Sequence, residues 1–237
     1  MTPAPVLQLE AARGVGEHLP QAALTLALFA GDFALVEIPG PRRGAAFADL
    51  CGGLAALASG HVRFLGHDWG ALPSTHADAL RGRIGRLFNA PLHPDTADVA
   101  ARVLLARQHH TRTPMAALRA EAAALALQFG LPGLPAGPAR LLSGPDLLRA
   151  ACVRAFVGQP RLVILELPLA AQGDDLLAAL LAVGAQARGG GATVLWLAAA
   201  GPALRDRALG ATHRLRLTES GLLPGRHAMR PLLSAGA

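Results

Sequence analysis

The stretch FALVEIPGPRRGAAFADLCGGL, residues 33–54, constrains the fold more than any other part of the sequence. Residues 33–38 form an apolar run of strand length, PGPRRG predicts a turn, and the small and apolar residues from Gly44 onward predict a helix packed on a sheet. A strand, a Gly-containing loop and a helix N-terminus form the geometry that binds phosphate in many proteins. Yet the side chains that perform phosphate chemistry are missing, and this mismatch is the main functional question.

Short apolar runs alternate with helix-like segments over most of the chain. Strands are predicted at residues 6–10, 23–29, 33–38, 61–65, 84–88, 162–165, 193–198 and 213–217. Helices are predicted between them, at residues 75–81, 99–108, 114–129, 142–157, 174–188 and 202–208. This order predicts an α/β fold in which the sheet is largely parallel.

The segment between residues 89 and 144 is helical and is bounded by the Pro-rich stretches PLHPDTAD and GLPGLPAGP. We therefore predict a helical subdomain at 89–144, inserted into a sheet domain. The whole chain, 1–237, is predicted to be a single domain. Residues 1–88 and 145–237 would form its core, with a β part at the N-terminus.

Positive charge in this chain comes from arginine alone, because none of the 22 Lys and Arg residues is a lysine. Any function that needs an ammonium group, such as a phosphate-loop lysine or a Schiff base, is therefore excluded. The net charge is +6, but the arginines are scattered and acidic residues lie between them. This distribution favours a solvated basic surface over a nucleic-acid groove, so nucleic acid is not expected as a partner.

The compartment follows from the cysteines and the apolar segments. Cys51 and Cys152 lie far apart and form no CxxC or Cys/His cluster, which is typical of a reducing compartment. The sequence MTPAPVLQLE shows no signal-peptide pattern, and runs such as ALTLALFA are far shorter than a bilayer span. We therefore expect a cytoplasmic protein that can still sit on a membrane partner.

Taken together, the order of elements resembles the nucleotide-binding subunit of an ABC transporter over nearly the whole chain. LSGPDLLRAACVRAFVGQPRLVILELPL aligns without a gap on the family's signature helix and Walker B strand, and GDFALVEIPGPRRGAAFADLCGGL aligns without a gap on Walker A. RIGRLFNAP resembles the approach to the Q-loop, and THRLRLTESGLL resembles the last strands. The resemblance implies a P-loop NTPase-like core with helices on both faces, a small antiparallel β part and an inserted helical subdomain.

The Walker A resemblance places the cofactor-binding loop on a degenerate set of residues: Gly40, Arg42, Arg43, Gly44, Ala45 and Ala46. Gly44 stands where the family has its lysine, and Ala45 and Ala46 replace the hydroxyls that contact Mg²⁺. Pro41 and Arg43 occupy glycine positions, and Pro41 also lacks a donor N–H. A plain surface turn is the favoured interpretation, and a weak anion site at the start of the following helix is the alternative.

The signature stretch of the family corresponds to Ser143 and Gly144. Ser143-x-x-Asp146 reads as a capping box, with Pro145 in the first turn, which predicts a well-defined helix start. In the family this serine faces the γ-phosphate bound by the partner subunit. Here Pro145 lacks the N–H and Asp146 adds negative charge, so the ligand role is expected to be weakened.

The remaining catalytic positions also depart from the family. Asn89 replaces the Q-loop glutamine with a shorter amide, and Glu166 stands at the Walker B aspartate. Leu167 stands at the catalytic glutamate and can neither accept a proton nor orient a water. The switch histidine would fall near Ala199, where the sequence has no histidine. No confident catalytic residue and no protein metal ligand are therefore assigned.

The resemblance leads to a function hypothesis. It implies a degenerate ATP-binding subunit, a pseudo-ATPase that docks on a membrane permease, on a second ABC ATPase subunit or on its own copy, at the inner face of the plasma membrane. No cofactor is expected, since ATP and Mg²⁺ would bind only through weak surviving contacts. LLARQHHTRTP, residues 104–114, resembles Mla-type lipid transport subunits. The alternatives are an active ATP-hydrolysing subunit with divergent motifs and a non-transport scaffold or weak nucleic-acid-binding protein.

Overall fold

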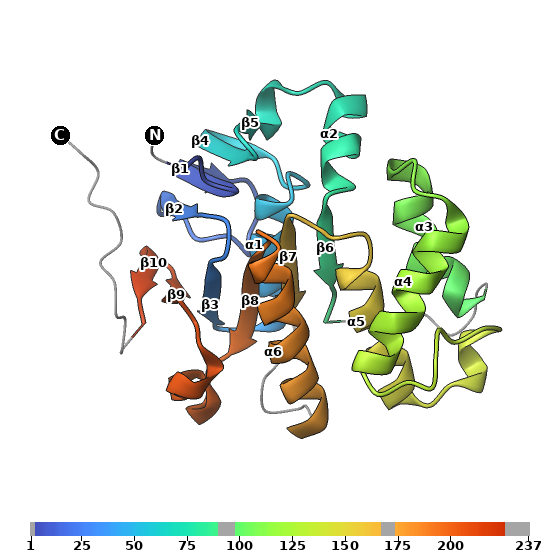
Figure 1. Cartoon of the computed structure of the whole chain (residues 1–237). Coiled ribbons are helices and arrows are strands. Elements are labelled where there is room, and N and C mark those ends of the chain that lie inside the picture. Colours follow the sequence, from blue (N-terminus) through green and yellow to red (C-terminus); the bar gives the residue numbers. More distant parts are fainter. Residues whose placement is uncertain (1–2, 90–97, 167–173, 226–237) are drawn as a thin grey trace.

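The computed structural model describes residues 3–89, 98–166 and 174–225. A six-stranded sheet forms the centre of the molecule, with a smaller four-stranded sheet beside it and helices around both (Figure 1). Among the described residues, no helix is long and apolar enough to cross a membrane. The mixed α/β architecture predicted from the sequence is confirmed.

The large sheet has the strand order β10-β9-β3-β8-β7-β6. Its parallel part joins β3 to β8 and β9, β8 to β7, and β7 to β6, while β10 pairs antiparallel with β9. The strands are β3 (Phe33–Ile38), β6 (Ile84–Leu87), β7 (Leu162–Glu166), β8 (Thr193–Ala199), β9 (His213–Thr218) and β10 (Gly221–Pro224). Because the paired strands from β9 to β6 run in one direction, their carboxyl ends meet at one edge.

The small sheet is antiparallel and comes from the N-terminal part of the chain. Its order is β2-β1-β4-β5, with β1 (Leu7–Gly14), β2 (Leu24–Leu28), β4 (Leu57–Phe64) and β5 (His67–Asp68). It packs into the same apolar cluster as α1 (Pro41–Cys51), which also contains Ala34, Val36 and Ile38 of β3. The β part expected at the N-terminus is therefore present.

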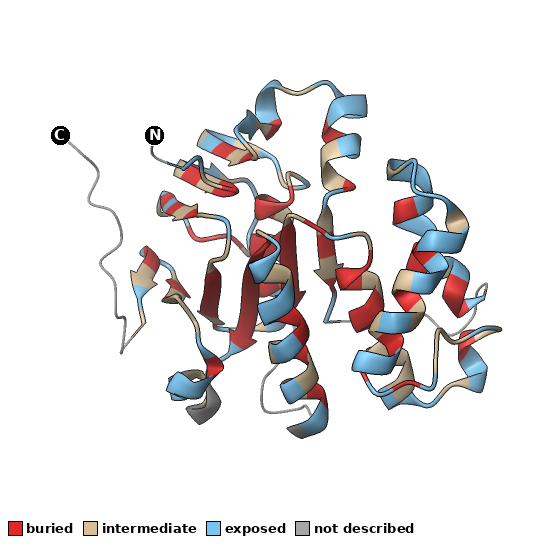
Figure 2. Cartoon of the chain, in the orientation of Figure 1, coloured by how far each residue is buried: buried red, intermediate tan, exposed pale blue. Residues whose placement is uncertain are grey.

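Alternate residues of β3 point to opposite faces of the large sheet, as the two-residue period of a strand requires. Phe33 and Leu35 belong to the second apolar cluster, which α5 (Gly144–Phe156) and α6 (Asp174–Gly189) cover. The central strands β3, β7 and β8 are buried over almost their whole length (Figure 2), which explains their nearly continuous apolar sequences.

A helical part follows β6 in the chain and lies to one side of the sheet (Figure 1). It contains α3 (Val99–His110) and α4 (Met115–Gln128), which pack with α5. The buried side chain of Arg107 joins it to the core, because its guanidinium donates hydrogen bonds to the carbonyl oxygens of Val157 and Gly82. A further helix, α2 (Ser74–Arg81), precedes β6.

Two local predictions are wrong. The stretch PGPRRG was expected to be a turn before a helix starting at Gly44, but α1 already begins at Pro41. Proline suits the first turn of a helix, because its missing N–H has no helical acceptor there. The helix predicted at 202–208 consists of two short 3₁₀ turns, Pro202–Arg205 and Arg207–Leu209.

Candidate functional site

The carboxyl ends of β3, β7 and β8 face the start of α1 at one edge of the large sheet. A cavity of about 200 Å³ lies there, lined by Ile38, Pro41, Gly44, Asn89, Glu166, Leu197 and Ala199. The fold thus brings together the predicted lysine, Q-loop, Walker B and switch positions, which are up to 155 residues apart, from Gly44 to Ala199. Most of the lining is apolar, and Asn89 and Glu166 contribute its polar side chains.

The first turn of α1 replaces the loop that would surround a phosphate. The N–H of Gly44 donates a helical hydrogen bond of 3.1 Å to the carbonyl oxygen of Gly40. In a phosphate loop this N–H would point at the ligand. Because it is already bonded within the helix, Gly44 offers neither a side chain nor a free backbone donor. PGPRRG therefore contains the start of a helix and is not the plain surface turn that was predicted.

The side chain of Ile38 lies next to Gly44, on the cavity side of the helix. A Cβ atom placed on Gly44 would lie 2.4 Å from Cδ1 of Ile38, so a larger residue fits only if the isoleucine moves. The Walker A resemblance predicts a lysine at the position of Gly44, and the contact with Ile38 leaves little room for a side chain there.

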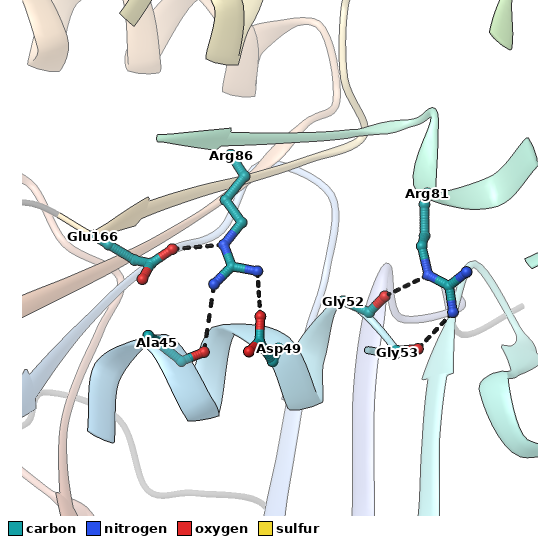
Figure 3. A network of polar contacts seen from close by, with 7 residues as sticks. All are labelled: Ala45, Asp49, Gly52, Gly53, Arg81, Arg86 and Glu166. Carbon is teal, nitrogen blue, oxygen red and sulfur yellow. Dashed lines mark hydrogen bonds and ion pairs between the residues drawn. The ribbon is translucent and has the colours of Figure 1, made fainter. Parts of the chain in front are cut away.

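The guanidinium of Arg86 bonds Glu166, one of the residues that line the cavity (Figure 3). Its Nε lies 2.6 Å from Oε1 of Glu166, and its Nη1 lies 2.5 Å from Oδ1 of Asp49. Its Nη2 lies 3.4 Å from the carbonyl oxygen of Ala45 in α1. Glu166, at the Walker B position, is thus joined to an arginine of the neighbouring strand.

The side chains of this network differ in how far they are exposed to solvent. The side chains of Arg86 and Glu166 are 11% and 4% exposed, whereas that of Asp49 is 42% exposed. Burial acts to lower the pKa of Arg86, but its hydrogen bonds to Glu166 and Asp49 outweigh burial and raise the pKa above its ordinary value. Arg86 therefore stays charged and compensates the Glu166 carboxylate.

Sequence reasoning missed Arg86, although one signal was available. Residues 84–87 read IGRL, so an arginine interrupts an otherwise apolar strand at a position facing the candidate site. A charged residue in a buried strand needs a partner, and Glu166 ends the adjacent strand. The partner could have been sought among acids at the ends of the predicted strands.

The signature residues have a helix-capping role. Ser143 is the N-cap of α5, and its Oγ accepts a 3.2 Å hydrogen bond from the N–H of Asp146. The predicted helix start at Ser143 is therefore confirmed, but Oδ2 of Asp146 accepts a 2.8 Å hydrogen bond from the Oγ of Ser143 rather than from its N–H, so the pair forms only half of a capping box. Ser143 and Gly144 do not line the 200 Å³ cavity. Leu167 lies outside the described residues.

A second, more open hollow adjoins the outer side of the α1 start. It is lined by His18, residues 39–43 and Glu219, and the guanidinium of Arg43 pairs with Glu219. Arg42 is exposed, and first-turn N–H groups of a helix have no helical acceptor. Among the predicted loop residues, Arg42 and Arg43 are therefore the ones that could contact a phosphate. Ala45 and Ala46 provide no side-chain donor.

No protein-family model and no curated protein matches the sequence. Solved structures do match. One, described as an ATP-binding subunit of an ABC transporter, has a TM-score of 0.76 at 18% identity and covers 92% of this chain and 88% of its own. The ATP-binding cassette MJ0796, in a dimeric post-hydrolysis state bound to ADP and Pi, has a TM-score of 0.74 at 18% identity, covering 95% and 99%. CbiO1 from Clostridium perfringens, part of the transporter complex cbiONQ, has a TM-score of 0.72 at 16% identity, covering 93% and 87%.

These comparisons show that the chain has the fold of ABC transporter ATP-binding subunits, as the resemblance implied. They contradict the prediction that no cofactor is expected. MJ0796 is described with ADP and Pi, and the similar cassette MJ1267 is described in its ADP conformation. A nucleotide is therefore the ligand class found with this fold, and the prediction of none was wrong.

Proposed function

We propose that the chain is a degenerate ATP-binding subunit of an ABC transporter, a pseudo-ATPase that docks on a membrane permease or on a partner ATPase subunit. The fold comparisons support the cassette part of this proposal. One observation carries the loss of hydrolysis: Glu166, at the Walker B position, is paired with Arg86 and faces a mainly apolar cavity.

Phosphoryl transfer depends on groups that position the phosphate and water and stabilise the developing charge. In this cavity, Ile38, Pro41 and Ala199 cannot donate a hydrogen bond from a side chain or accept a proton. Glu166 is the carboxylate on the lining, and Arg86 holds its Oε1. Because several contributions are absent together, we expect turnover to be lost rather than reduced.

Hydrolysis and nucleotide binding are separate measurements. We expect no phosphate release above background when the purified protein is incubated with ATP and Mg²⁺, while calorimetry with ATP and with ADP measures binding. If phosphate is released, the assay is repeated with Glu166→Gln. Phosphate release that does not change in this variant comes from a contaminating ATPase. Phosphate release that falls in Glu166→Gln would show an active ATPase and refute the proposal.

The docking part of the proposal rests on the surface around Phe88, at the end of β6. Phe88 is 42% exposed, and the guanidinium carbons of Arg86 and Arg154 lie 4.5 and 5.3 Å from its ring centroid. Burial lowers the pKa of Arg154, and nearby Arg102 lowers it further. Within the described residues Arg154 has no acidic partner, so we propose that an acidic and apolar segment of the partner binds here.

Co-purification tests this surface. Phe88→Asp should abolish capture of the permease from detergent-solubilised membranes, since it replaces the exposed ring by a carboxylate that Arg154 can pair within the chain. Leu141→Asp is the matched control, because Leu141 is an apolar residue that is 74% exposed and lies far from Phe88 in the sequence. Equal capture of the permease by both variants would refute this docking surface.

The finer assignments belong to the same proposal: a cytoplasmic protein, peripheral at the inner face of the plasma membrane, divided into a core at 1–88 and 145–237 and a helical subdomain at 89–144. Lipid transport rests on residues 104–114. In that stretch Arg107 is buried and bonds two core carbonyl oxygens. The presence of this arginine is therefore also explained by packing of the helical part on the core, without lipid transport. Lipid transport is therefore the least supported of these assignments.

A further inference from the structure

A hollow of about 510 Å³ lies between the helical part and the core, at the amino-terminal ends of β7 and β8. This is the edge of the sheet opposite the candidate nucleotide site. Three elements supply its walls: α4, the connection from α5 to β7, and α6. The volume lies within the range typical of small-molecule sites, which is roughly 300–1,000 Å³.

Polar side chains line this hollow, and three of them, Gln128, Gln159 and Gln186, are also exposed to solvent. Gln128 comes from α4, Gln159 and Arg161 from the α5–β7 connection, and Gln186 from α6. Within the described part of the chain, none of these four side chains makes a hydrogen bond or an ion pair. The Arg161 guanidinium passes beside Gly191, where an added Cβ would lie 3.4 Å from Nη1.

The connection between α5 and β7 has a constrained backbone at the hollow. Gln159 has a φ of 49°, in the left-handed region that residues other than glycine rarely adopt. The adjacent N–H of Gly158 donates a 2.8 Å hydrogen bond to Oε1 of Glu121 on α4. This bond fixes the acid against the backbone. The strained conformation at Gln159 places a polar side chain on the hollow, as is frequent at binding sites.

The chemistry of the walls selects a ligand class. Leu125, Phe156 and Val183 provide an apolar surface, while one guanidinium and three amides provide hydrogen-bond donors. The hollow has a single cation on its lining and a carboxylate, Glu121, in its wall. A monoanion is therefore favoured over a doubly charged phosphate.

We infer that this hollow binds a small organic carboxylate with an apolar body, its carboxylate on Arg161 and its apolar part against Phe156. Such a ligand touches α4 of the helical part and α6 of the core at once. Its binding therefore stabilises one arrangement of these two parts. The inference does not depend on the proposed pseudo-ATPase function.

Calorimetric titration with 3-phenylpropionate tests the site, with 3-phenylpropan-1-ol as the neutral analogue. We expect saturable one-to-one binding of the acid, and binding of the alcohol weaker by roughly tenfold or more, because a charge-assisted bond to the guanidinium is lost. Arg161→Met should weaken binding of the acid by a similar factor. Arg119→Met, an exposed arginine of α4 outside the hollow, should bind the acid as the unchanged protein does.

A second variant separates occupancy of the hollow from charge elsewhere. Ala124→Phe adds a ring at an exposed lining residue of α4 and should block the acid without removing a cation. The inference is overturned if the acid shows no saturable binding, if acid and alcohol bind equally, or if Arg161→Met binds the acid unchanged. Tighter binding of phenyl phosphate than of 3-phenylpropionate would likewise overturn the carboxylate assignment.

Discussion

Replacing Arg86 by methionine tests whether this arginine compensates the buried carboxylate of Glu166. Methionine keeps much of the side-chain volume but removes the cation that lies 2.6 Å from Glu166. The carboxylate, 4% exposed, would then have no counter-charge. Breaking a buried pair in this way typically costs about 3–5 kcal/mol. Loss of the pair with Asp49, which is 42% exposed, adds at most about 1 kcal/mol.

The free energy of unfolding, measured by urea denaturation at pH 7, is the assay. Arg86→Met should lose about 3–5 kcal/mol. The double variant Arg86→Met with Glu166→Leu removes both charges and should recover most of the loss, because the uncompensated carboxylate causes it. Arg81→Met is the matched control: Arg81 bonds the carbonyl oxygens of Gly52 and Gly53 and the exposed Asp78, and leaves no buried acid behind.

Two results would refute this reasoning. A loss below about 1 kcal/mol for Arg86→Met would mean that the Glu166 carboxylate does not need Arg86 as its counter-charge in the folded protein. A double variant no more stable than Arg86→Met would mean that Arg86 acts through packing, for example on Phe88, rather than through Glu166. In either case the pairing would no longer support the loss of hydrolysis.

Three further predictions concern the helices and the thiols. Ser143→Ala should lower the free energy of unfolding by about 1 kcal/mol in urea, because α5 loses its N-cap bond, whereas Ser143→Asp should lose much less. Arg107→Met leaves the carbonyl oxygens of Val157 and Gly82 without this donor. Relative to the unchanged protein, hydrogen exchange of the α3 amides should therefore speed up more than that of the amides in β7 and β8. Burial raises the pKa of Cys51 and of Cys152 from 9.0 to about 12, so iodoacetamide at pH 8 should label neither thiol until urea unfolds the chain. The stability that these protonated thiols contribute is complete below about pH 9 and should be lost as the pH rises toward 12.

Local patterns were sufficient for the framework of the fold. The apolar run at residues 33–38 became β3, and the capping box at Ser143 became the start of α5, because both features depend on neighbours in the sequence. The small antiparallel β part was predicted through the family resemblance rather than through periodicity. At the candidate site, Gly44, Asn89 and Glu166, which the resemblance assigned to one nucleotide site, line one cavity, and their binding roles stay predictions.

Contacts between distant residues account for what the sequence did not reveal. Arg86 and Glu166 are 80 positions apart, so no local pattern links them. The start of α1 was misplaced because Pro-Gly-Pro fits both a turn and a helix N-terminus. The packing of Ile38 against Gly44 is a tertiary contact that accompanies the helical alternative. The residue types at Pro-Gly-Pro alone could not decide between a turn and a helix N-terminus.

The helix α1 explains how this fold is compatible with the proposed loss of phosphate-binding residues. Its buried contacts come from Phe47, Ala48, Leu50 and Cys51, each at most 1% exposed, and these residues follow the degenerate loop positions. Arg42, by contrast, is exposed at the first turn. Because burial of apolar surface dominates the stability of such a helix, changes at residues 40–43 affect the ligand site far more than the fold. The surface around Phe88 is formed by residues of β6 and α5 instead, so the proposed docking does not depend on whether α1 contacts a nucleotide.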